Sequence, residues 1–384
     1  MQRDELAAWL RLSLTPGVGN ESARRLLAAF GLPQAVFAQS ATALQQLVSP
    51  AQTRALQQIP EGFDAQLATT WDWLNAAESG PARQIVCLAD ASYPQALLQA
   101  SDPPLMLYTL GSRALDRDLG SGTTAASIAV VGSRNPTPQG AANAEAFARA
   151  LSRAGLIVVS GMALGVDGAA HKGALDGADG GAGGTVAVVG TGLDRVYPKR
   201  HLELAHRISA HGLIVSEFAL GTPPLDANFP KRNRIIAALG QGTLVVEAAL
   251  QSGSLITARL AVELGREVFA IPGSIHSPQS RGCHALIRQG AKLVETAEDV
   301  LEELKIPFAT NSIASSQDLV RTSGQNDSKM QLLGALGFDP SSLDALQART
   351  GLDTATLQAW LLELELDGLV ARLPGGLFQQ LRLA

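Results

Sequence analysis

The segment SIAVVGSRNPT (residues 127–137) decides the fold class, because it joins a short apolar β-branched run to a polar loop that opens with glycine. Runs of the same kind begin at 156 (LIVVS), 185 (TVAVV), 212 (GLIVS), 243 (TLVVE) and 267 (EVFAI), so successive starts lie 24 to 31 residues apart. Helix-like stretches lie between them. Strands that alternate with helices in this way predict an α/β core, 81–305, whose parallel sheet is covered on both faces. Two earlier runs, 85–89 and 105–108, are expected to add strands at one edge.

Two smaller domains are expected to flank the core. Residues 1–80 carry apolar side chains at helical spacing around the turn TPGVG (15–19), which predicts a small helical domain of the helix-hairpin-helix (SAM-like) kind. Such a turn can direct backbone N–H groups at an anion, although a plain helical hairpin explains the same pattern. Residues 306–328 are polar and predict a linker. Three helical stretches and a glycine-turned hairpin in 329–384 predict a winged-helix domain.

The last of these three helices, 354–367, carries three acidic residues and no Lys or Arg. A helix that reads bases in the major groove needs hydrogen-bond donors or positive charge. We therefore expect this helix to contact protein or to regulate, and not to read DNA.

Composition excludes several classes of protein. Apolar residues make up 46% of the 384 and charged residues only 17%, so the chain can bury a large core and is not a charge-rich disordered protein. Two cysteines are too few for a disulfide framework or a Cys-rich zinc site. No apolar run is long enough for a membrane helix and the start lacks a signal-peptide pattern, so we expect a cytoplasmic protein without membrane contact. With a net charge of −5, any affinity for nucleic acid must come from a local patch.

Candidate site residues come from the loops at the carboxyl ends of the strands, where parallel sheets bind ligands. Gly132, Ser133 and Arg134 offer close backbone approach, a hydroxyl and a guanidinium that can fork two phosphate oxygens. The strongest cluster is FPKRNR (229–234), with three cations in four positions at the start of a helix. Cations there oppose the helix dipole, which indicates an anion between them. The turn SGS (252–254) precedes another helix, whose free N–H groups are expected to hold a phosphate.

Two polar residues near these loops have simpler explanations. Asp167 is expected to cap the helix that begins beside it, and His171 to pack or hydrogen-bond in the core, since it has no partner at metal-ligand spacing. The loops show no nucleophile beside a histidine and no Walker-type motif. The pattern therefore predicts binding to a phosphate backbone with no catalytic residue, no metal and no cofactor.

Taken in order, GSRNPT (132–137), SGMALGVDGAAHKGAL (160–175), GTGLDRVYP (190–198), FPKRNRIIAAL (229–239) and VVEAALQSGSLITARLA (245–261) resemble the motifs of the DprA/Smf family of DNA-processing proteins. The resemblance implies a Rossmann-like core that binds single-stranded DNA, forms a homodimer through the 255–290 region and helps to load RecA recombinase in natural transformation. The resemblance implies that Arg134, Lys231, Arg232 and Arg234 form the basic pocket for the strand. Phe229 and the turn of Ser252, Gly253 and Ser254 are expected to line the same region, and Asn233 to hold the loop by bonds to the backbone. Gly132 and Ser133, beside Arg134, complete the predicted DNA-binding set.

Two other functions stay open. The segment GQGTLVVE (240–247) is similar to the signature of nucleotide phosphoribohydrolases of the lysine-decarboxylase-like type, although the Pro-Gly-Gly lead-in is missing and Glu247 is expected to end a strand. A purely structural adaptor, the third possibility, would retain no DNA.

Overall fold

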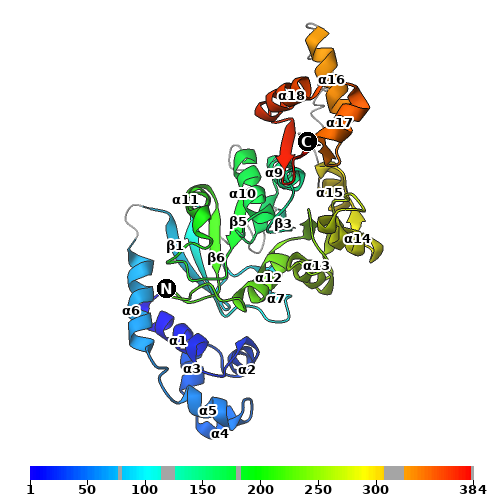
Figure 1. Ribbon diagram of the computed structural model, residues 1–384. Coiled ribbons are helices and arrows are strands. Elements are labelled where there is room, and N and C mark those ends of the chain that lie inside the picture. Colours follow the sequence, from blue (N-terminus) through cyan, green and yellow to red (C-terminus); the bar gives the residue numbers. More distant parts are fainter. Residues whose placement is uncertain (77–79, 114–125, 179–182, 307–323, 382–384) are drawn as a thin grey trace.

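A nine-stranded sheet forms the centre of the molecule (Figure 1). The computed structural model describes residues 1–76, 80–113, 126–178, 183–306 and 324–381. The strand order is β1-β2-β6-β5-β4-β3-β7-β8-β9, with every pair from β6 to β9 parallel and with β1 and β2 antiparallel at one edge. The strands are β1 (Ala82–Cys87), β2 (Met106–Gly111), β3 (Ser127–Val131), β4 (Ile157–Ser160), β5 (Gly184–Val188), β6 (Leu213–Ser216), β7 (Gly242–Val245), β8 (Glu267–Ala270) and β9 (Lys292–Leu293).

All six apolar runs of the core are strands β3 to β8, and both edge strands are present, so the predicted parallel α/β core is confirmed. The short strand β9 was not predicted, because its two residues are exposed and show no apolar run. The chain builds outward from β3 through β4 to β6, then crosses to the other side of β3 for β7 to β9. The strand order therefore reverses between β3 and β7, which is where sheets of this kind form a crevice for a ligand.

Alternate residues of each core strand point to opposite faces, and helices cover both faces (Figure 1). In β3, Ala129 and Val131 pack with one set of helices, whereas Ile128 and Val130 pack with the other set. The first set is α7 (Gln95–Leu98), α12 (Asn228–Leu239), α13 (Ser254–Glu263) and α14 (Arg281–Arg288). The second set is α9 (Pro138–Arg153), α10 (Val166–Gly177) and α15 (Ala297–Glu303), with α11 (Leu202–His211) over the β5 and β6 end.

Helices α9 and α10 pack at backbone distance because α10 carries glycine at the crossing. A Cβ atom at Gly173 would overlap the carbonyl oxygen of Glu145, and one at Gly177 would overlap that of Arg149. No side chain larger than hydrogen fits at either position without moving a backbone. These glycines fix the helix that follows β4 against the helix that follows β3.

His171 on α10 is fully buried. Its Nδ1 lies 2.7 Å from the hydroxyl of Thr185, which itself donates to the Val158 carbonyl at 2.8 Å. Nδ1 must therefore be the protonated nitrogen, and Nε2 is a deprotonated acceptor without a hydrogen-bond partner in the described ranges. Burial lowers the pKa of His171 to about 3, with further lowering by His201 and Arg232. The expected role as a hydrogen-bonded core histidine is confirmed.

The amino-terminal helices pack against the β1 and β2 side of the sheet (Figure 1). As predicted, the turn 15–19 separates two helices, the second of which begins at Asn20. Asn20 and Arg24 reach the loop before β2, where they donate to Asp102 Oδ2 at 3.2 Å and to the Ser101 carbonyl at 2.7 Å. These helices are α1 (Arg3–Leu14), α2 (Asn20–Phe30), α3 (Pro33–Phe37), α4 (Ala41–Gln45), α5 (Pro50–Leu56) and α6 (Phe63–Asn75).

The carboxyl-terminal residues form a winged helix with a core of its own, at the opposite end of the molecule from α1 to α5 (Figure 1). Its helix α16 (Gly324–Leu336) begins earlier than the predicted start at 329, and 307–323 of the predicted linker lie outside the described residues. The domain boundaries at 80 and 305 stay predictions. The remaining elements are α17 (Leu343–Thr350), α18 (Thr354–Leu366), β10 (Ser341–Ser342), β11 (Val370–Leu373) and β12 (Leu377–Gln380).

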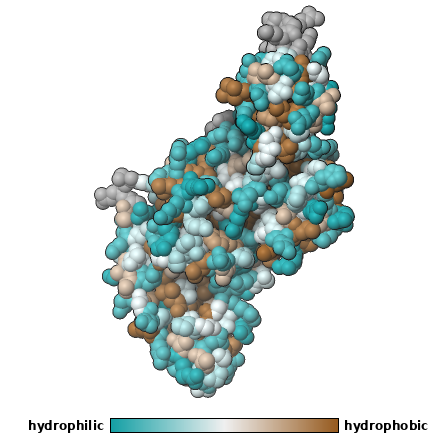
Figure 2. Space-filling model, viewed as in Figure 1, coloured by the Kyte–Doolittle hydropathy of each residue, from teal (hydrophilic) through white to brown (hydrophobic). Residues whose placement is uncertain are grey.

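The visible surface is mostly hydrophilic, with apolar residues in small separate groups (Figure 2). No helix among the described residues has the length and apolar character that a bilayer crossing requires.

Candidate functional site

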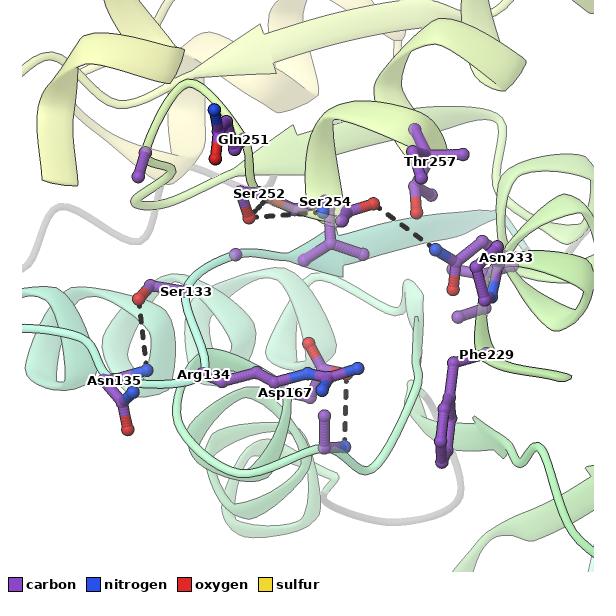
Figure 3. Close-up of a pocket in the computed structure, with 18 of the residues that line it drawn as sticks. Ser133, Arg134, Asn135, Asp167, Phe229, Asn233, Gln251, Ser252, Ser254 and Thr257 are labelled. Carbon is purple, nitrogen blue, oxygen red and sulfur yellow. Dashed lines mark hydrogen bonds between the residues drawn. The ribbon is translucent and has the colours of Figure 1, made fainter. Parts of the chain in front are cut away.

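A pocket of about 470 Å³ lies at the carboxyl ends of the central strands, beside the point where the strand order reverses (Figure 3). Four loops line it, those after β3, β4, β7 and β8, together with residues of α12 and α13. Nine of the residues predicted from sequence meet here: Gly132, Ser133, Arg134, Phe229, Arg232, Asn233, Ser252, Gly253 and Ser254. The structure therefore brings together loops that lie more than a hundred residues apart in the chain.

Arg134 is the exposed cation of this pocket. Its guanidinium carbon lies 5.5 Å from the centroid of the Phe229 ring, a cation–π distance, and Figure 3 shows both side chains beside the same space. No carboxylate forms an ion pair with Arg134 in the part of the chain that the structure describes. Arg134 is therefore available to an anion that enters the pocket.

The turn before α13 supplies hydroxyl groups to the pocket. The Ser252 and Ser254 hydroxyls lie 2.7 Å apart, and Asn233 Nδ2 donates to the Gly253 carbonyl at 3.4 Å, which joins α12 to this turn. The expectation of free N–H groups here is wrong for the first amides: Ser254 N donates to Ser252 Oγ at 3.3 Å, and Leu255 N to the Ser252 carbonyl at 3.1 Å. The polar groups that the turn offers are therefore its hydroxyls and the positive end of the α13 dipole.

Arg232 lies beneath the pocket and is only 4% exposed. Its guanidinium donates to the carbonyl of Gly161 at 2.6 Å and to that of Val188, so it joins the ends of β4 and β5. Burial lowers the pKa of Arg232 to about 10, although the nearby Asp167 carboxylate opposes that change. The sequence predicted that Arg232 contacts DNA. In the structure its guanidinium is buried and stabilises the base of the pocket through hydrogen bonds to two strand ends.

Asp167 also belongs to the pocket lining, which the sequence did not indicate. The residue that caps α10 is Gly165, with φ +82°, so the expectation that Asp167 caps this helix is wrong. Its carboxylate instead accepts from Ala163 N at 3.2 Å and lies near Arg232, while burial raises its pKa. The Asp167 carboxylate therefore holds the loop after β4 and balances the buried guanidinium.

Lys231 and Arg234 do not line the pocket. Both are directed to Glu217, just after β6: Arg234 forms a close ion pair with it, and Lys231 Nζ lies 4.0 Å from its Oε2. Arg234 Nε also lies 3.5 Å from Asp102 Oδ2. The Glu217 side chain is only 5% exposed, and burial raises its pKa even though both cations act in the opposite direction. The anion that the sequence required between these cations is thus supplied by the protein itself.

Lys231 remains half exposed, with its ammonium nitrogen 5.6 Å from the centroid of the Phe218 ring. It is therefore the one cation of FPKRNR that combines solvent exposure with a position beside the pocket-lining Phe229 and Arg232.

Gln279 is a pocket residue that sequence reasoning missed. It follows β8 in a short 3-10 turn, Pro278–Ser280, and its Oε1 lies 3.4 Å from the Ser133 hydroxyl, while its Nε2 donates to the Asn135 carbonyl at 3.3 Å. Gln279 thereby fixes the loop that carries Arg134. A glutamine in a polar loop gives no sequence signal for such a contact.

Glu247 lies in the loop two residues beyond the end of β7, and not at the end of the strand as expected. Its carboxylate accepts from Thr137 N at 2.9 Å and from Thr137 Oγ1 at 2.6 Å, at the start of α9. It does not line the pocket, and burial raises its pKa. The residue thus stabilises the helix that follows the Arg134 loop.

Comparison with known proteins decides the family. The family model described as DNA recombination-mediator protein A matches residues 84–305, and one described as DprA winged helix domain matches 321–376. Protein Smf of Escherichia coli is 42% identical over 293 residues, which make up 74% of each chain. The chain belongs to the DprA/Smf family. The family indicated by the sequence motifs is confirmed.

Solved structures of two DprA proteins resemble this chain. The X-ray structure of DNA processing protein A from Streptococcus pneumoniae has a TM-score of 0.64 and 36% identity, and the match covers 80% of this chain and 99% of that one. DNA processing protein A from Helicobacter pylori, studied for its single-stranded DNA binding mode, has a TM-score of 0.50 and 29% identity, over 59% of this chain and 98% of that one. The DprA fold therefore extends across the core of this protein.

Proposed function

We propose that this member of the DprA/Smf family binds single-stranded DNA in the pocket between β3 and β7, without sequence preference. The observation that carries the proposal is the exposed Arg134 guanidinium, which has no ion-pair partner among the described residues and lies against the ring of Phe229. A guanidinium forks phosphate oxygens, and an aromatic ring stacks any base, so neither contact depends on sequence. The single-stranded DNA binding mode described for the Helicobacter pylori relative supports the same conclusion.

The proposed ligand contacts divide by chemistry. Arg134 and Lys231 provide positive charge for phosphates, Phe229 provides a stacking surface, and the Ser252 and Ser254 hydroxyls provide hydrogen bonds. Arg232 and Arg234 contribute through the shape and potential of the site, since their guanidinium groups already have partners inside the protein.

We further propose that the bound strand serves recombination in natural transformation, that the protein helps to load RecA recombinase on it, and that it acts in the cytoplasm. The description of the matching family as a recombination mediator supports this role. For the homodimer, the predicted 255–290 region carries two exposed apolar side chains, Val262 at 62% and Ile275 at 74%. Burial of these two side chains against a second copy would remove apolar surface from water, which favours association.

A salt titration with oligonucleotides tests the proposal. The parent protein should bind oligothymidine more tightly than a duplex of equal length, and Arg134→Ala should lower the slope of log K against log salt by about 0.7, the value for one phosphate contact on a single strand. Arg153→Ala, an exposed arginine at the far end of α9, is the matched control and should leave the slope unchanged. Equal slopes for the parent and Arg134→Ala would remove the pocket from consideration. Release of free base from a nucleoside monophosphate would favour the phosphoribohydrolase instead.

A further inference from the structure

Helix α18, the last helix of the winged helix, carries apolar side chains on its outer side as well as on its buried side. Leu357, Leu361 and Leu364 pack into the core of the winged helix. On the opposite side, Leu362 is 57% exposed and Leu366 is 80% exposed. In Figure 2, apolar residues (brown) lie on the winged helix where Figure 1 places α18. A helix that is apolar on both sides is typical of one that is covered on both sides.

The exposed apolar residues of α18 lie in one line. Ala355, Ala359, Leu362 and Leu366 follow one another at intervals of four, three and four residues, and all four are exposed. At about 100° per residue, this spacing places them within about 60° of the helix circumference. These four residues form the α18 outer face. Their spacing is that of the a and d positions of a coiled coil, which pack against a second helix.

The residues beside the α18 outer face are acidic in one half of the helix and uncharged in the other. Glu363 and Glu365 flank the half that ends the helix, whereas Thr356 and Gln358 flank the half that begins it. Glu363 is paired with Lys329 of α16, and Glu365 forms no ion pair among the described residues. Because α18 has no Lys or Arg, this face repels phosphates, and the partner that it fits is a protein.

We propose that the α18 outer face docks on the α18 outer face of a second copy of this chain, with the two helices antiparallel. Ala355 then lies opposite the partner's Leu366, and Ala359 opposite the partner's Leu362. Each contact joins a small side chain to a large one, so the two identical faces interdigitate around a two-fold axis.

The charges favour the same orientation. In the antiparallel pair Glu365 lies beside the partner's Gln358, whose amide can donate to the carboxylate, and near the positive end of the partner's helix dipole. A parallel pair would instead place the acidic ends of both helices together and set alanine against alanine. This contact is separate from the DNA pocket and from the 255–290 region, so its test does not depend on the proposed function.

Cysteine cross-linking with a short bismaleimide tests the pairing. A pair of 13-residue helices is smaller than a standard interface, so the contact should be weak, and a cross-link captures a weak contact. An equal mixture of Ala355→Cys and Leu366→Cys should give a cross-linked dimer, whereas neither variant alone should. Two copies of position 355 would lie about 16 Å apart along the helices, because eleven residues separate them. The parent, whose Cys87 and Cys283 are buried, is the control. The proposal is overturned if the mixture gives no dimer, or if each variant cross-links with itself instead.

Sedimentation equilibrium over a concentration series tests the leucine contact. Leu366→Gln should weaken this self-association roughly tenfold or more, because burial of one leucine side chain is lost in each copy. Leu366→Met keeps an apolar side chain and should behave like the parent, as should Ile59→Gln, a change at a 65% exposed residue outside the winged helix. The parent's thermal unfolding in Leu366→Gln would show that the variant is folded. If folded Leu366→Gln associates as the parent does, the α18 outer face is not the contact.

Discussion

Replacing Arg232 with methionine should destabilise the protein core more than it changes the DNA surface. The substitution removes the two hydrogen bonds that join the loop after β4 to the end of β5, at Gly161 and Val188. It also leaves the Asp167 carboxylate buried without the cation that balances it. Removing one partner of a buried charge pair typically costs about 3–5 kcal/mol, and methionine fills most of the vacated volume, so we expect a loss near the lower end, about 3 kcal/mol.

Hydrogen exchange measured by mass spectrometry is the appropriate assay. Fluorescence would mostly report on the flanking parts, because the tryptophans are Trp9, Trp71, Trp73 and Trp360. A loss of about 3 kcal/mol raises the population of the open state roughly a hundredfold or more, and this increase should appear in peptides that cover β4 and β5. Arg134→Met makes the same change at an exposed position of the same pocket and should alter exchange by less than about 0.5 kcal/mol.

A second substitution makes the result decisive. Adding Asp167→Asn to Arg232→Met removes the carboxylate that lost its cation, so the double variant should recover part of the lost protection from exchange. The interaction energy between the two substitutions should be about 0.5–3 kcal/mol. If Arg232→Met kept the parent's exchange pattern and yet lost oligonucleotide binding, Arg232 would be a DNA ligand, and the reasoning from its burial would be refuted.

Three further predictions concern the elements that support the pocket. Glu217→Gln weakens the buried ion pairs with Lys231 and Arg234 of α12, so urea unfolding should show a loss of about 2–3 kcal/mol in the free energy of unfolding. The affinity for an oligonucleotide should stay equal or rise, because the substitution removes a negative charge that faces α12. In the folded protein the pKa of His171 is lowered to about 3, so the unfolded chain takes up a proton at this residue that the folded protein does not. The free energy of unfolding should therefore fall as the pH drops from about 6.5 toward 3. By pH 5.5 the loss in the free energy of unfolding should be about 1 kcal/mol, and hydrogen exchange of His171→Asn should not show this dependence on pH. Gly173→Ala should cost about 1–3 kcal/mol in thermal or urea unfolding, whereas Gly334→Ala, in open space on α16, should be neutral or stabilising.

Sequence patterns predicted the fold because the information was local. Each core strand is an apolar run, each crossover has the length of a helix, and the carboxyl ends of parallel strands must meet at one edge. The loops of Arg134 and Ser252 could therefore be placed together from the amino-acid sequence alone. The short strand β9 escaped because its pairing with β8 depends on tertiary position and not on its own residues.

The roles of the three cations in FPKRNR could not be read from their spacing. Successive helix positions differ by about 100°, so Lys231 and Arg234 share one side and Arg232 points elsewhere, but the sequence does not say which side faces the core. That is decided by Glu217, 17 residues before Arg234, and by the carbonyl groups of Gly161 and Val188 at the ends of β4 and β5. The contact of Tyr197 with Phe229 is likewise a product of the fold, because a ring in a loop has no periodicity that predicts its neighbour.

The reversal of strand order between β3 and β7 has a mechanical consequence. Between β6 and β7 the chain passes from one half of the sheet to the other through the segment from Glu217 to α12, and among the described residues the β3–β7 ladder also joins the halves, together with the contacts of Glu247 and Gln279 to the loop after β3. A DNA strand bound to Arg134 on one side and to Ser252 on the other would span this seam, the boundary between β3 and β7. It would have to dissociate before the two halves of the sheet could separate. Occupancy at a hundred times Kd adds about 2.7 kcal/mol against that separation, so a loaded protein should also resist proteases at the seam.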